Sequence, residues 1–111
     1  MQKKKIHTKF DSILAKKKEL RFRLTTRDGR QEYFKFMSVL NYCLNQLTNE
    51  YREILEESYL NPKFRFWWVD KYCKSSFYRK RVTAISSFVR LFDLIYENYP
   101  HFSVNISSAI S

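Results

Sequence analysis

The sequence predicts an all-α protein, a small single-domain helical bundle of four to five helices. The chain has one Gly and two Pro among its 111 residues, too few for the many tight turns of a sandwich or barrel. Apolar residues recur three and four positions apart over long stretches, as on one face of a helix. Hydrophobic residues make up 44% of the chain, which is enough for the core of one domain.

The chain divides into three parts. Residues 1–7 are basic and are expected to form a frayed arm. Residues 8–102 are predicted to form the helical domain. Residues 103–111 are small and uncharged, and the sequence indicates no regular structure for this tail.

The first predicted helix begins at Thr8, whose hydroxyl can cap it, and reaches about Glu19. Its apolar face is formed by Phe10, Ile13 and Leu14. Residues 21–26 alternate weakly between polar and apolar side chains, which is compatible with a strand and with a continued helix. The only glycine lies within residues 27–30, which are predicted to form a turn.

Two further helices are predicted in the middle of the chain. One spans about residues 31–46, and its apolar face comprises Phe34, Met37, Leu40, Cys43 or Leu44, and Leu47. The other is capped by Thr48. It ends at Asn61, because a residue that precedes proline disfavours the helical conformation.

The aromatic and basic stretch that follows is predicted to form two helices separated by a break. A two-turn helix is expected over residues 65–72, with the break at residues 73–75. The last long helix starts in this break, runs to about Tyr96 or Tyr99 and is stopped by Pro100. Its apolar face is formed by Phe77, Ala84, Ile85, Phe88, Val89, Phe92 and Ile95.

Positive charge is concentrated in two blocks. The formal net charge of the whole chain is +10. Residues 1–30 contribute +8 and residues 62–90 contribute +7, whereas residues 31–61 and 91–111 contribute −3 and −2. Such blocks suit a phosphate backbone, because each neutralised phosphate releases counterions. The alternative is a solvated basic surface, and we favour nucleic acid because the second block coincides with the last predicted helix.

Residue types that carry catalysis or bind metals are sparse. Cys43 and Cys73 show no metal-binding spacing and are expected to be reduced thiols, while His7 and His101 lie in terminal segments. One glycine excludes the glycine-rich phosphate loops of nucleotide-binding enzymes. We therefore expect neither an enzyme nor a bound metal or cofactor.

No apolar run approaches the ~20 residues of a membrane span, and no apolar segment follows the basic start as in a signal peptide. A cytoplasmic protein without a membrane partner is expected. The lysine-rich, glycine-poor composition is typical of an AT-rich bacterial genome.

The start of the last helix is the strongest candidate site. Polar and basic residues in its first turns, in front of an apolar back, are the pattern of a helix that enters a DNA groove. Residues expected to read or touch the groove are Lys74, Ser75, Ser76, Tyr78, Arg79 and Arg81. Residues expected to hold phosphates are Lys63, Arg65, Lys71 and Lys80. The alternative is a basic solvated face on a structural helix.

The aromatic residues before that helix have two interpretations. They are Phe64, Phe66, Trp67, Trp68 and Tyr72. We expect them to be mainly core, because a two-turn helix needs large side chains to hold it against its neighbours. Alternatively, they stack on single-stranded bases, since basic residues are interleaved with them.

A family resemblance rests on three segments: residues 47–55 leading to Tyr59, residues 67–72, and residues 74–79 continued by Arg81, Ala84, Ile85 and Phe88. Together these segments, within 51–92, resemble the helix-turn-helix of phage-type transcriptional regulators of the ArpU and RinA group. That motif is itself similar to region 4 of sigma-70 factors. The resemblance implies a helix-turn-helix near residues 50–92, sequence-directed binding of double-stranded DNA and contact with RNA polymerase.

Two alternatives to a DNA-binding regulator remain open from the sequence. One is a protein-interaction module that docks on RNA polymerase through the acidic helix over residues 50–57. The other is an RNA-binding protein that uses the basic arm and the aromatic residues.

Overall fold

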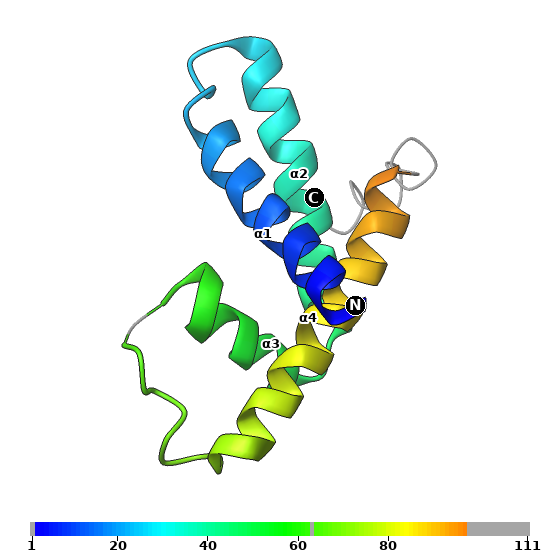
Figure 1. Cartoon of the computed structure of the whole chain (residues 1–111). Coiled ribbons are helices and arrows are strands. Elements are labelled where there is room, and N and C mark those ends of the chain that lie inside the picture. Colours follow the sequence, from blue (N-terminus) through cyan, green and yellow to red (C-terminus); the bar gives the residue numbers. More distant parts are fainter. Residues whose placement is uncertain (1, 63, 98–111) are drawn as a thin grey trace.

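Four α-helices make up most of the part of the chain that the computed structural model describes, residues 2–62 and 64–97, with side chains described from residue 6 (Figure 1). They are α1 (Gln2–Arg21), α2 (Arg27–Gln46), α3 (Asn49–Leu55) and α4 (Lys74–Glu97). A short π-helix, η1 (Glu56–Leu60), continues α3. The described residues contain no strand, so the predicted all-α class is confirmed.

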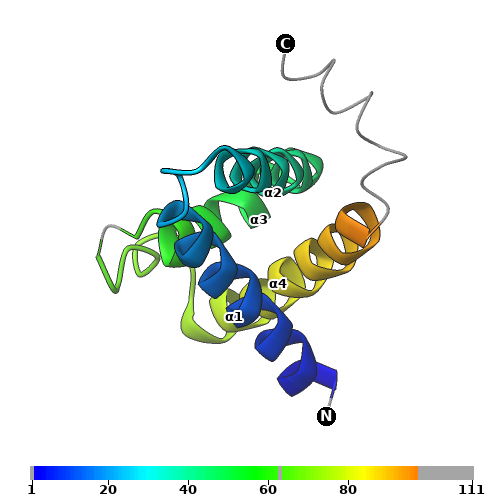
Figure 2. The same cartoon turned by 90° about the horizontal axis from the view of Figure 1, so that it is seen from above.

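Helix α4 packs against each of the other three helices and is the central element of the bundle. Helices α1 and α2 lie side by side as a hairpin, and α4 crosses them (Figures 1 and 2). At its N-terminal end α4 meets α3. Residues 61–62 and 64–73 lie between η1 and the start of α4, away from the α1–α2 loop (Figure 1). We call residues 61–73 the connection.

The core lies where α1, α2 and α4 meet, and its aromatic content gives it edge-on ring contacts. The Phe10 and Phe88 rings are 5.8 Å apart at 90°, and the Phe36 and Phe92 rings are 5.4 Å apart at 64°. Such pairs add about 0.5–1.5 kcal/mol beyond the burial of their surface. The predicted apolar face of the last helix is confirmed, since all seven of its residues are buried.

Two predictions for the N-terminal region are wrong. Helix α1 begins at Gln2 rather than Thr8, so the segment expected to be a frayed arm is helical from Gln2 onward. Ile6 packs against the core and anchors this first part of the helix. Residues 22–25 form turns, neither a strand nor a continued helix. The amides of Phe22 and Arg23 bond back to carbonyls three residues earlier, at 3.1 Å each, which closes α1.

The turn predicted at residues 27–30 is also wrong, because these residues form the first turn of α2. Thr26 caps the helix by accepting a hydrogen bond from the Gly29 amide at 2.9 Å. Gly29 is needed for space and not for an unusual backbone angle. A Cβ atom there would lie 1.9 Å from the Arg23 carbonyl oxygen.

The middle of the chain follows the prediction at its helix ends, but the placement of Phe34 on the apolar face is wrong, since this side chain is 66% exposed. Helix α2 ends at Gln46, and Thr48 caps α3 by accepting a hydrogen bond from the Tyr51 amide at 3.3 Å. The helical segment ends at Asn61, before Pro62, as expected. Its last turn is a π-helix, in which the Asn61 amide bonds to the Glu56 carbonyl at 2.7 Å.

The helix predicted over residues 65–72 is wrong. These residues form consecutive turns, in which the amides of Trp67, Val69 and Lys71 bond to carbonyls three residues earlier at 3.0–3.3 Å. A helix-turn-helix joins its two helices by a turn of about three to four residues. Here the longer connection lies between η1 and α4. It contains turns where the helix over residues 65–72 was predicted.

The last helix begins at Lys74, inside the expected break, and continues to Glu97. Lys63, Tyr99, Pro100 and the tail predicted over 103–111 lie outside the described residues.

We expect Gly29→Ala to destabilise the protein by about 1–3 kcal/mol, the usual cost of overpacking. Helix propensity alone predicts the opposite sign, since Ala is better than Gly inside a helix by about 1 kcal/mol. The free energy of unfolding in urea distinguishes the two effects. Gln31→Ala, at an exposed position of α2, is the matched control, and equal or higher stability of Gly29→Ala contradicts the steric explanation.

Candidate nucleic-acid interface

Cys73 occupies the position that caps α4. Its carbonyl accepts the first helical hydrogen bond, from the Phe77 amide at 2.9 Å. Its thiol receives a hydrogen bond from the Ser76 amide and lies 3.8 Å from the Ser75 hydroxyl. These contacts stabilise the thiolate, and the backbone bond from Ser76 is the main cause of a lowered Cys73 pKa. The thiol thus caps the helix as a serine hydroxyl does elsewhere.

Four of the predicted groove-reading residues form one exposed surface on the first turns of α4. We call this surface the α4 front; it consists of Lys74, Ser75, Tyr78 and Arg79. Phe77 is only 1% exposed and fixes the orientation of these turns. Because a helix has 3.6 residues per turn, Ser75 and Arg79 then point away from the core. The predicted Ser76 is half-buried at the edge of this surface.

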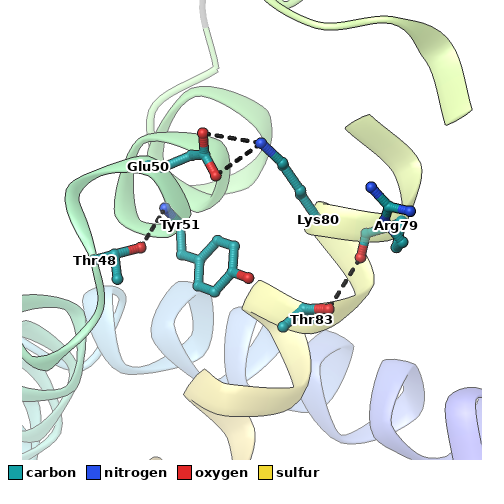
Figure 3. A network of polar contacts seen from close by, with 6 residues as sticks. All are labelled: Thr48, Glu50, Tyr51, Arg79, Lys80 and Thr83. Atoms are coloured by element: carbon teal, nitrogen blue, oxygen red, sulfur yellow. Dashed lines mark hydrogen bonds and ion pairs between the residues drawn. The ribbon is translucent and has the colours of Figure 1, made fainter. Parts of the chain in front are cut away.

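Two of the predicted phosphate-binding lysines are engaged by carboxylates of α3. The Lys80 ammonium lies 3.1 Å from both carboxylate oxygens of Glu50, and the Lys71 ammonium lies 3.0 Å from Glu53. Figure 3 shows Lys80 reaching across to Glu50, while the Arg79 side chain points away from it. These ion pairs hold α4 and the connection against α3. Each contributes about 1 kcal/mol or less, as is usual for solvent-exposed pairs.

Arg81 was expected to contact the DNA groove, but it is half-buried behind the α4 front. Its guanidinium lies 4.7 Å from the Tyr78 ring centre and 6.0 Å from that of Phe77. It also interacts with the Tyr59 hydroxyl: burial raises the Tyr59 pKa, and Arg81 opposes this rise. The Arg81 Nε is buried without a hydrogen-bond partner. Arg81 is therefore not part of the exposed α4 front.

The connection presents one more predicted cation. Arg65 is exposed, and its guanidinium lies 5.5 Å from the Phe66 ring centre. Lys63, the remaining predicted phosphate contact, is outside the described residues.

The aromatic residues of the connection are core only in part. Trp68 stacks on Phe77 with ring centres 4.4 Å apart and planes at 6°, and Trp67 meets Phe77 edge-on at 5.8 Å. Phe64 and Phe66 are 65% and 58% exposed, so the expectation that they are core is wrong. Three of the five, Trp67, Trp68 and Tyr72, contact Phe77 at the start of α4, and the other two face solvent.

The described residues contain no group of three or more side chains arranged to bind a metal ion. Among their helices, none combines the length and the apolar character that crossing a bilayer requires. Comparisons of the chain with protein-family models, curated proteins and solved structures give no match. The resemblance to phage-type regulators therefore rests on the sequence segments alone.

The two thiols should differ sharply in reactivity. Burial raises the Cys43 pKa to about 12, whereas Cys73 is exposed with a lowered pKa. We expect Cys73 to react rapidly with iodoacetamide in the native protein, and its labelling rate should be half-maximal at a pH below the ordinary thiol pKa. Cys43 should react only after unfolding. Cys73→Ser keeps a capping oxygen and should abolish native labelling. Rapid native labelling of that variant contradicts the assignment.

Proposed function

We propose that this protein is a sequence-directed DNA-binding regulator of transcription that inserts the α4 front into the major groove of double-stranded DNA. One observation carries the proposal: the cationic first turns of α4 are exposed while their aromatic back is buried. A recognition helix needs both properties, because the back fixes its orientation and the front must reach base edges.

The placement of the α4 front supports this function. The start of α4 lies away from the α1–α2 loop, at one end of the molecule (Figure 1). Arg79 has the planar fork that pairs bidentately with guanine. Lys74 and Ser75 lie in the first turn of α4, where the side chains and the positive end of the helix dipole favour a phosphate.

The surroundings of the front suit a duplex. Lys71 and Lys80 lie beside it and add positive potential, although Glu50 and Glu53 neutralise part of it. In this proposal α3 takes the part of the supporting helix of a sigma region 4-like unit. The long connection replaces the short turn.

The observations favour DNA over docking on RNA polymerase through the acidic helix. Glu50 and Glu53 are the start and the middle of that acidic surface, and both are paired with cations of the same chain. A partner that binds there must first displace these lysines. Polymerase contact thus remains the second candidate.

Arg79→Ala should lower affinity for the preferred duplex by about 1–3 kcal/mol and relax preference at one base pair. Selection of bound duplexes from a random pool, followed by mobility shifts with Arg79→Ala, measures both effects. Arg90→Ala removes the same charge from an exposed position further along α4. If the two variants lose affinity equally and keep the same preference, Arg79 does not read a base.

Glu50→Gln should strengthen duplex binding, because it releases Lys80 and removes a negative charge beside the α4 front. One additional phosphate contact steepens the dependence of log affinity on log salt by about 0.9. Titrations between low and moderate salt provide the measurement. Glu32→Gln makes the same change in net charge on α2 near the α1–α2 loop, and identical behaviour of the two variants argues against a duplex at this surface.

A further inference from the structure

A groove of about 480 Å³ lies between η1, the connection and the start of α4. Its size is within the range of small-ligand sites. None of the four residues of the α4 front lines it. The groove is therefore separate from the α4 front, although Arg65, a predicted phosphate contact, lines it.

One wall of the groove is aromatic and partly open to solvent. Phe64, 65% exposed, and the half-buried Trp67 both line it, with Phe77 behind them. The Trp67 indole N–H donates to the Ser58 hydroxyl at 3.2 Å, which fixes the ring. Burying the exposed apolar surface of a phenylalanine is favourable. A flat ring placed against this wall buries part of that surface by stacking.

Two arginines line the same groove, Arg65 on the connection and Arg81 on α4. Arg81 is held in place by its contacts with Tyr59 and Tyr78, and its buried Nε has no hydrogen-bond partner. Guanidinium groups bind phosphates through paired hydrogen bonds. This pair therefore favours a ligand that carries a negative group next to its flat ring.

Glu57 also lines the groove and limits which anions fit. A carboxylate disfavours a bare phosphate by like-charge repulsion, so the ring must supply much of the affinity.

We infer that this groove binds a nucleotide, with its base against Phe64 and Trp67 and its phosphate on Arg65 and Arg81. The shared chemistry is a base with one phosphate, which is present in a free mononucleotide and in an unpaired residue of a single strand. The site does not rest on the proposed duplex contact, because it uses none of Lys74, Ser75, Tyr78 or Arg79.

Calorimetric titration of the full chain tests the inference with the four nucleoside 5′-monophosphates, the matching nucleosides, inorganic phosphate and a single-stranded tetranucleotide. At least one monophosphate or the tetranucleotide should bind ten or more times tighter than its nucleoside and than phosphate. A monophosphate that binds as tightly as the tetranucleotide identifies a free nucleotide, and a tetranucleotide advantage above tenfold identifies a strand. Binding of phosphate alone, or of nothing, overturns the inference.

Exposed positions supply variants that keep the fold. Phe64→Ala and Arg65→Gln should each lower nucleotide affinity at least fivefold. Phe34→Ala removes a phenylalanine of nearly equal exposure, 66%, on α2, and Arg90→Gln removes an exposed arginine on α4. Neither control variant should change nucleotide affinity. Unchanged affinity in Phe64→Ala, or equal losses in Phe34→Ala, overturns the site.

The proposed duplex contact and the proposed nucleotide site can be tested separately. Arg79→Ala should leave nucleotide affinity within twofold of the parent protein, and Phe64→Ala should leave duplex affinity within twofold. If Phe64→Ala and Arg79→Ala each lower both affinities equally, one surface serves both ligands and the separate nucleotide site is wrong.

Discussion

The packing of Phe77 against the connection determines how the basic half of the molecule is presented. Phe77 is buried beneath two tryptophans, one stacked on it and one edge-on. This contact orients the first turns of α4. The connection has no helix of its own among its described residues, and the hydrogen bond from the Trp67 indole N–H to the Ser58 hydroxyl joins it to η1. Loss of the contact would free both the exposed cations on one side of α4 and the groove on the other.

Electrostatics then separates the cations that are available to a partner from those that hold the fold together. Lys71 and Lys80 are tied to carboxylates of α3, and Arg81 is held against aromatic rings. Lys74 and Arg79 on α4, and Arg65 on the connection, remain exposed. The formal charge of residues 62–90 therefore overstates the positive charge that is available to a phosphate backbone. The exposed cations still lie at one end of the molecule, which is what an electrostatic footprint requires.

The sequence predicted the long helices well because their signals are local. Periodic apolar residues marked α2 and α4, and Thr48 marked the cap of α3. The prediction of a helix over residues 65–72 was wrong because their aromatic content suggested a buried helical face. Tertiary contacts with Phe77 use Trp67 and Trp68 on non-helical turns instead. The turn predicted around Gly29 was wrong for a related reason. The small size of this residue allows a close approach to Arg23 inside a helix.

The candidate site was predicted as a list of cations and not as a surface. Helical spacing separates Arg79, which is exposed, from Arg81, which is half-buried, because Arg81 follows Phe77 by four residues and shares its face of α4. Spacing does not show the partner of Arg81 in another element, Tyr59 of η1, which lies twenty-two positions earlier in the chain. The pairing of Lys80 with Glu50 likewise joins residues thirty positions apart, beyond the reach of a helical-spacing argument.

The two candidate surfaces meet at Tyr78. Its ring centre lies 4.7 Å from the Arg81 guanidinium, and 5.7 and 5.9 Å from the ring centres of Phe77 and Trp68. Arg81 lines the groove, and Tyr78 belongs to the α4 front. Substitution of either residue disturbs both surfaces, so a loss of binding there does not identify which surface carries the ligand. Arg79 on one side and Phe64 on the other each belong to one surface only. Separate effects at these two positions would show that α4 carries two independent recognition surfaces.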